Sequence, residues 1–253
     1  MKKLNNYILE KLNIKDINID HYTCKPKSKN DLRNIVEARL ERDKDADLND
    51  IDVSQINDMS LLFNKLDPHH IDISRWNVSN VKDMNGIFLY CKNFSSDLSK
   101  WDVSKVTDMH HMFYNCMKFE SDLSNWNVSS VTTASSMFAF CYDFNSDLSK
   151  WNVSKVTDMH HMFYGCEEFN SDLSNWNVSS VTTASSMFVF CYDFNADLSN
   201  WDVSNMTRID NMFYECYDFN ADLSNWDVSK VTDMYNIFKG CTSLKNIPSW
   251  YKE

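Results

Sequence analysis

The chain has 253 residues, a formal net charge of −11, 43% hydrophobic residues and 24% charged residues. This composition is typical of a folded chain and excludes wholesale disorder, while the negative charge argues against direct binding to nucleic acid. The only glycines are Gly86, Gly165 and Gly240, each isolated. The glycine-rich loops that cradle dinucleotides and nucleoside triphosphates are therefore excluded.

Residues 1–50 are expected to form an N-terminal helical cap. The pattern predicts a helix over 28–42, with Ser28 or Asn30 as its N-cap and an apolar stripe that includes Leu32 and Val36. A second helix is expected over 2–12. Together the two helices would cover the open end of the array that follows.

The start of the chain carries two lysines, but no apolar run of signal-peptide length follows them. No stretch reaches the roughly 18 apolar residues that a membrane span needs. We therefore expect a cytoplasmic protein with no membrane partner. A cell-surface or secreted location is the alternative if a leader has been removed.

Residues 51–253 are expected to form one repeat array, because tryptophan, valine, phenylalanine, cysteine and leucine each recur every 25 residues. A fixed period of 20–50 residues is typical of repeat architectures. Residues 101–150 and 151–200 are identical at 42 of 50 positions, which indicates a duplicated pair of units. The units begin near Ile51, Trp76, Trp101, Trp126, Trp151, Trp176, Trp201 and Trp226.

Each unit is predicted to contain one short strand and one helix of about two turns. The strand is expected near Trp101 and Val103, and Met109, Phe113 and Cys116 then share one face of a helix. One unit buries too little apolar surface to offset its backbone entropy, so neighbouring units must stack. The predicted fold is α/β, a right-handed solenoid of about eight strand–helix repeats behind the helical cap.

Seven of the eight cysteines belong to the 25-residue pattern, from Cys91 to Cys241. These seven cysteines occupy one equivalent position in successive units, and an odd number of them cannot all pair in disulfides. We therefore expect buried free thiols that pack as small hydrophobic groups.

The motif W-[DN]-V-S-x-V-T-D-M-x-x-M-F-Y-x-C-x-x-F-N-x-D-L-S, as at 151–174, resembles the repeat of BspA-like bacterial surface proteins, which are relatives of leucine-rich repeats. The resemblance covers residues 51–250, and the segments 29–33 and 46–52 resemble the helical leader that precedes such arrays. It implies an α/β solenoid that binds proteins, and surface members of the family are associated with adhesion. It implies no catalytic residues.

Histidine and cysteine give weak candidates for metal binding. His110-His111 and His160-His161 lie two units apart, roughly 10 Å if strands pair at their usual spacing, which is too far for one Zn²⁺. We favour a solvated face for these pairs. His21 and Cys24 form an isolated pair without further ligands.

An aspartate column precedes the leucine column, as at Asp97 and Asp122. Stacked carboxylates repel one another, so we expect each to accept N–H groups of its own turn, as in Asx turns. Ca²⁺ held between neighbouring turns is the alternative. The Asn-x-Ser/Thr sequences, as at Asn77, are interpreted as turn caps because aspartate replaces asparagine at equivalent positions such as Asp102.

The residues between the two phenylalanine columns vary from unit to unit. This variation indicates that core packing does not determine them. They combine aromatic and acidic side chains, a composition that suits a partner surface, although an ordinary solvated surface is the alternative. The candidate partner-binding residues are Tyr114, Tyr142, Tyr164, Tyr192, Tyr214, Tyr217, Asp143, Asp193 and Asp218.

These observations predict a non-enzymatic repeat scaffold that binds a protein partner through one long acidic, tyrosine-bearing face. No singular constellation of catalytic groups stands out, and no cofactor or metal is expected. One alternative is an intracellular inhibitor that mimics acidic nucleic acid. Another is a surface adhesin whose signal is missing from this sequence.

Overall fold

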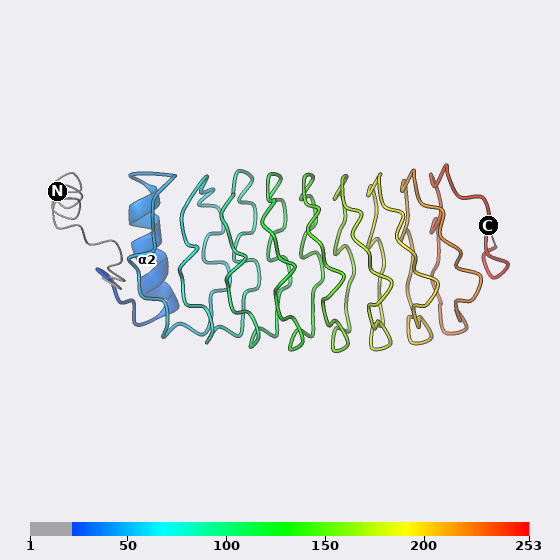
Figure 1. Ribbon diagram of the computed structural model, residues 1–253, viewed down its shortest axis with the longest axis horizontal. Helices are drawn as coiled ribbons and strands as arrows, with labels where there is room; N and C mark the ends of the chain where they lie inside the picture. Colours follow the sequence, from blue (N-terminus) through cyan, green and yellow to red (C-terminus); the bar gives the residue numbers. More distant parts are fainter. Residues whose placement is uncertain (1–21, 253) are drawn as a thin grey trace, which may run out of the picture.

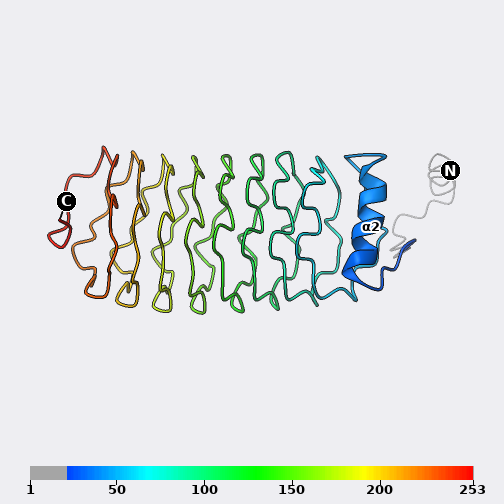
Figure 2. The ribbon, with the colours of Figure 1, turned by 180° about the vertical axis from the view of Figure 1, so that it is seen from behind.

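The computed structural model describes residues 22–252, which form a row of coils side by side along one axis (Figure 1). Helix α2 (Lys29–Leu40) lies at the N-terminal end of the row and is the only helix of the described residues. The view from behind shows the same order, with each coil between its sequence neighbours (Figure 2). The helix expected over 2–12 lies outside the described residues.

Backbone hydrogen bonds join each coil to the next in one register. The N–H groups of His111, Phe113 and Asn115 donate to carbonyl groups 24 residues ahead, at N···O distances of 3.0, 2.9 and 2.7 Å. The same donors repeat through the array, and isolated parallel bridges link residues 25 apart, as between Asp83 and Asp108. The coils therefore pair in parallel, each with its immediate neighbours.

The predicted make-up of the unit is wrong, because residues 51–252 contain no helix and no strand longer than a single bridge. The segment 109–116 is a run of tight turns, in which the N–H groups of Tyr114 and Cys116 donate three residues back, to His111 and Phe113. The intervening N–H groups point to the next coil, so they cannot make the bonds of an α-helix. The α/β description does not apply to these units, and the handedness of the winding stays a prediction.

Two positions in every coil have a left-handed backbone with positive φ, such as His111 (54°) and Asn115 (61°). Left-handed conformation costs a non-glycine residue roughly 1 kcal/mol or more. All three glycines of the chain occupy these two positions, with φ of 55° at Gly86, 72° at Gly165 and 86° at Gly240. The glycines are therefore placed by backbone geometry.

The interior consists of stacked columns of equivalent side chains. Successive rings of the phenylalanine column that includes Phe113 and Phe138 stack with centroids 5.6 Å apart, and both side chains are fully buried. Seven of the eight tryptophans and most of the thiols are buried as well, and all eight cysteines are free, as the sequence predicts. Burial in this apolar interior raises the pKa of thiols such as Cys116 well above the usual range, so they are poor nucleophiles.

Tryptophan and cysteine also serve as hydrogen-bond donors between coils. The indole N–H of Trp126 donates to the carbonyl of Leu98 at 3.0 Å, and the thiol of Cys141 donates to the carbonyl of Phe113 at 3.0 Å. Equivalent bonds, with donor and acceptor 28 residues apart, recur along the array. These carbonyls also accept an N–H group of their own turn, so the indole and thiol find buried acceptors that have a second lone pair to offer.

Aspartate and asparagine side chains close the turns, as expected. The Oδ1 atom of Asp97 accepts the N–H of Ser99 at 2.9 Å, and that of Asp102 accepts the N–H of Ser104 at 3.0 Å. These serine bonds are the main reason that the pKa of Asp97 and that of Asp102 lie below the usual value. The column positions are therefore explained by turn capping.

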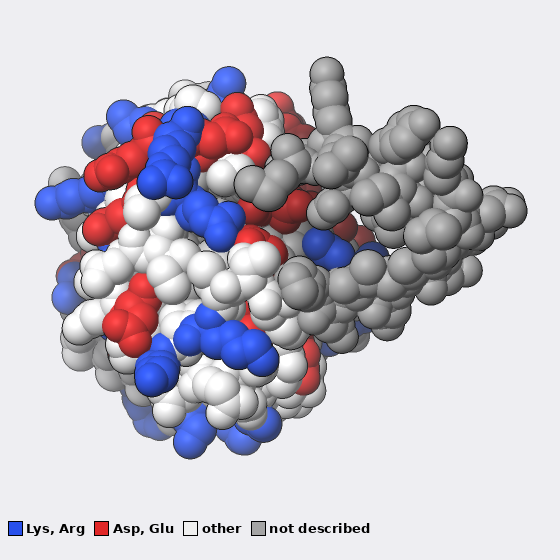
Figure 3. Space-filling view, turned by 90° about the vertical axis from the view of Figure 1, so that its left-hand side faces the viewer, with Lys and Arg blue, Asp and Glu red and all other residues white. Residues whose placement is uncertain are grey.

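Helix α2 covers the first coil. It begins after Ser28, whose side chain accepts the N–H of Asp31, and it buries Leu32 and Val36. The guanidinium of Arg33 donates to the carbonyls of Leu62 at 2.6 Å and Asn64 at 3.0 Å, which in later coils accept N–H groups from the preceding coil. Basic and acidic side chains are intermixed on this end of the molecule (Figure 3).

We predict that Gly165→Ala lowers the free energy of unfolding by about 1 kcal/mol, because an alanine is strained in the left-handed conformation at φ 72°. The added Cβ would lie 3.3 Å from a ring carbon of Phe140. Asn115→Gly, at the equivalent position one unit pair earlier, is the matched control and should change stability by less than about 0.5 kcal/mol. Urea unfolding measures both, and equal effects of the two substitutions would contradict the prediction.

Candidate protein-binding face

Six partly exposed rings from consecutive coils form a continuous aromatic row. Neighbouring rings contact edge to face or tilted, with centroids 5.4 Å apart between Tyr114 and Phe140 and 5.0 Å apart between Phe140 and Tyr164. Each ring comes from one of two adjacent positions, and the coil's other position holds a non-aromatic residue, as at Asn115 and Ala139. The aromatic row consists of Tyr90, Tyr114, Phe140, Tyr164, Phe190 and Tyr214.

Three of the predicted site residues, Tyr114, Tyr164 and Tyr214, thus belong to one row. Sequence reasoning missed Tyr90, Phe140 and Phe190, because it treated each repeat position as a separate column. The sequence does contain a signal for these residues: in each coil of the row, one of the two adjacent positions is aromatic and the other is not.

A second group of predicted tyrosines lies beside the row. The rings of Tyr192 and Tyr217 stack at 4.9 Å, and Phe190 of the aromatic row contacts Tyr192 at 6.3 Å. Tyr142 occupies the equivalent position two coils before Tyr192 and is half-buried. We call Tyr142, Tyr192 and Tyr217 the tyrosine strip.

Acidic side chains follow the tyrosine strip directly. Asp143, Asp193 and Asp218 are all exposed, and the backbone N–H of Asp218 donates to the carbonyl of Tyr192 at 3.1 Å, which fixes the register between them. A shallow hollow of about 550 Å³ beside Asp143 is lined by further carboxylates. They belong to Glu120, Asp122, Asp147 and Glu168.

On the other side of the aromatic row, histidines and rings enclose a hollow of about 380 Å³, which we call the imidazole hollow. Burial and the neighbouring imidazoles lower the pKa of His111 to about 4, and burial is also the main cause that lowers the pKa of His161. These two imidazoles are therefore uncharged near pH 7. The imidazole hollow is lined by His111, Tyr114, Ser136, Ala139, Phe140, His160, His161 and Tyr164.

The two histidine pairs make different polar contacts. His160 Nδ1 lies 2.7 Å from Asp158 Oδ1, whereas His110 Nδ1 contacts the hydroxyl of Ser135 on the next coil. No group of three or more histidine, cysteine, aspartate or glutamate side chains within residues 22–252 is placed to hold a metal ion. Of the isolated pair, His21 lies outside the described residues and Cys24 is half-buried beside Arg39.

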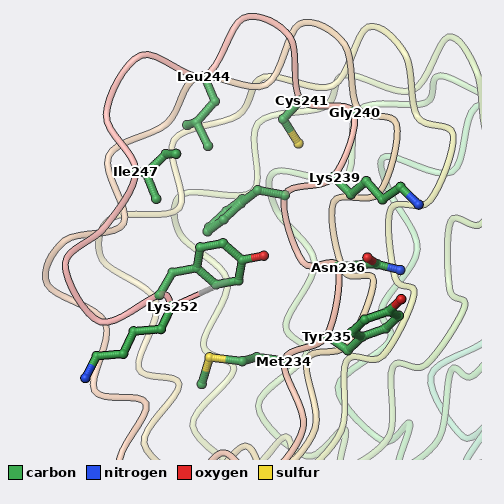
Figure 4. A pocket seen from close by; sticks show the side chains of 11 residues that line it. Met234, Tyr235, Asn236, Lys239, Gly240, Cys241, Leu244, Ile247 and Lys252 are labelled. Carbon is green, nitrogen blue, oxygen red and sulfur yellow. The ribbon is translucent and has the colours of Figure 1, made fainter.

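A further hollow, about 630 Å³, lies on the open side of the last described coil (Figure 4). Leu244 and Ile247 line it together with Lys252. Within the described part of the chain, the backbone N–H groups that face this side have no acceptor. They belong to Met234, Asn236, Phe238 and Gly240.

In the part of the chain that the structure covers, no helix has both the length and the apolar character needed to cross a membrane.

The fold and face together define a repeat protein in which 25-residue coils carry an aromatic and acidic surface. A family described as "Mycoplasma protein of unknown function, DUF285" matches residues 30–151 and 135–250, and the chain belongs to this family. The match covers both the α2 region and the coils. No curated protein and no solved structure matches the chain.

We predict that His111→Asn makes stability less dependent on pH. The pKa of His111 is about 4 in the folded protein and 6.5 in its unperturbed state, so the unfolded chain binds more protons between these values. The wild type should lose about 1–2 kcal/mol more than the variant between pH 7 and pH 4.5, after allowance for partial exposure.

The asparagine suits the site, because Asn211 has the same left-handed backbone at the equivalent position, with φ of 54°. Urea unfolding at several pH values measures the difference. Parallel pH profiles for wild type and variant would show that His111 does not titrate in this range.

Proposed function

We propose that this chain is a non-enzymatic scaffold that binds a protein partner along the face formed by the aromatic row, the tyrosine strip and the adjacent carboxylates. The main support for this proposal is that the face continues over consecutive coils, with ring contacts from Tyr90 to Tyr214. We further infer that the coils wind as a solenoid of the BspA-like kind, since stacked repeats present extended binding surfaces.

The rings of this face are not needed to fill the interior. The interior has its own fully buried columns, such as Phe138 and Phe144, whereas Tyr217 is 41% and Tyr90 46% exposed. Tyrosine supplies a large apolar area with a polar tip at low entropic cost, and such residues dominate binding energy at interfaces. Rows of exposed rings on a rigid stack therefore favour a binding role.

The charge of the face favours a basic partner. Asp143, Asp193 and Asp218 are exposed next to the tyrosine strip, and the whole chain carries a net charge of −11. Complementary charge accelerates the encounter with a partner and disfavours acidic competitors. The rings that the partner would cover are expected to supply most of the affinity. We expect the association rate to fall with increasing salt.

The hollows of this face are shallow and open, which supports binding rather than catalysis. The main titratable groups beside the aromatic row are the paired histidines and Asp158. His110 contacts the hydroxyl of Ser135, but this pair does not lie in a deep cleft of the kind in which a histidine activates such a nucleophile.

The test is affinity capture from the native cell with the full chain, its Tyr142/Tyr192/Tyr217→Ala variant and a control variant. Loss of the tyrosine strip should reduce recovery of the captured partner roughly tenfold or more, given the usual cost of losing interface tyrosines. The control, Asn125/Asn175/Asn200→Ala, removes exposed residues from another part of the coil and should leave recovery unchanged.

Circular dichroism and the unfolding midpoint of each variant establish that the coils remain folded. A partner recovered equally with all three proteins would overturn the assignment of the face. Recovery that does not respond to salt would contradict the basic character of the partner.

A further inference from the structure

We propose that the imidazole hollow binds the guanidinium group of an arginine side chain. The proposal rests on the proposed function in one respect, because the arginine would belong to the protein partner. It adds a single chemical group and a defined position to a face that otherwise has only a general charge preference.

The rings around the hollow offer π faces to a cation. Phe140 meets Tyr114 at an interplanar angle of 74° and Tyr164 at 57°, so neighbouring rings face different directions. All three side chains are half-buried. A planar guanidinium stacks on such faces and is more weakly hydrated than an ammonium group, so its desolvation costs less.

The same row already receives a cation elsewhere in this protein. Lys239 occupies the ring position one coil after Tyr214, and its ammonium nitrogen lies 5.4 Å from the centroid of the Tyr214 ring. The aromatic row therefore holds a positive charge at one end by its own side chain. The imidazole hollow presents equivalent tyrosines with no lysine above them.

His160 supplies a polar partner and Asp158 a negative charge. Nδ1 of His160 lies 2.7 Å from the Asp158 carboxylate, a contact that favours the tautomer with its proton on Nδ1 and a lone pair at Nε2. That lone pair can accept an N–H from a guanidinium. Because His111 and His161 are uncharged at neutral pH, they do not repel the cation.

Two of the residues that line the hollow change along the row. Ala139 lines it, whereas the equivalent position two coils later is Val189, and His161 is replaced two coils later by Asn211. The hollow therefore combines a small residue and the histidines of this coil pair with the rings of Tyr114 and Tyr164.

The experiment uses the full chain with ¹³C-labelled alanine methyl groups and the probe acetyl-arginine-amide. The methyl signal of Ala139 should shift in a saturable way, with a dissociation constant on the order of millimolar for one isolated group. The neutral isostere acetyl-citrulline-amide should cause no saturable shift. Acetyl-lysine-amide should bind several-fold more weakly than the arginine probe.

Tyr164→Leu should weaken arginine binding at least several-fold, whereas Tyr217→Leu, in the tyrosine strip, should not change it. The signal of buried Ala184 reports whether the fold is intact. No shift of Ala139, or equal shifts with citrulline, would overturn the cation site, and equal binding of lysine would overturn the guanidinium assignment.

The two proposals fail separately. If the arginine probe binds but the tyrosine-strip variant recovers its partner as well as wild type, the proposed face is wrong and the cation site stands. If the strip variant loses its partner while the probe does not shift Ala139, only the cation site is wrong.

Discussion

One register of backbone hydrogen bonds determines the structure: alternate N–H groups of each coil donate to carbonyls 24 residues ahead. This pairing leaves only turn-type bonds within a coil, as between Tyr114 and His111. It also requires two left-handed residues per coil, at positions that include all three glycines. Because every coil repeats the same path, equivalent side chains stack directly on one another, in the interior and on the surface alike.

Because the coils stack in one register, residues that repeat in the sequence make the same contacts in every coil. The carbonyls of Leu98 and Phe113 each accept an N–H group of their own turn, and the indole of Trp126 or the thiol of Cys141 adds a second donor from further along the chain. A carboxylate in a stacked column would repel its neighbours, and Asp97 instead caps its own turn. On the surface, the same geometry joins one ring per coil into the aromatic row. The proposed binding face is therefore a consequence of the register that builds the core.

Much of the fold could be predicted from the sequence, because period and burial are visible in the columns. The 25-residue unit, the buried thiols, the turn-capping aspartates and the Ser28 cap all follow from local chemistry. The internal make-up of the unit could not be predicted in the same way. Met109, Phe113 and Cys116 have helical spacing, but a ribbon of tight turns buries the same residues, and bonds to a neighbouring coil decide between the two.

The candidate site was predicted in part for a related reason. Tyr114, Tyr164 and Tyr214 were singled out as variable aromatic positions, and the structure brings them into one row. Tyr90, Phe140 and Phe190 complete that row from the adjacent, left-handed position, and a column-by-column reading separates them from the three predicted tyrosines. The imidazole hollow depends on contacts across three coils, which the sequence pattern does not specify.

Native-state hydrogen exchange tests the register most directly, because the last described coil offers matched pairs of amides. The N–H groups of Asn211 and Phe213 donate to the next coil at 2.8 and 3.0 Å, whereas those of Asn236 and Phe238 have no acceptor within residues 22–252. Asn211 and Phe213 should exchange orders of magnitude more slowly than Asn236 and Phe238, although both phenylalanine side chains are buried. Exchange of Asn211 and Phe213 as fast as that of Asn236 and Phe238 would contradict the stacked register on which the proposed binding face depends.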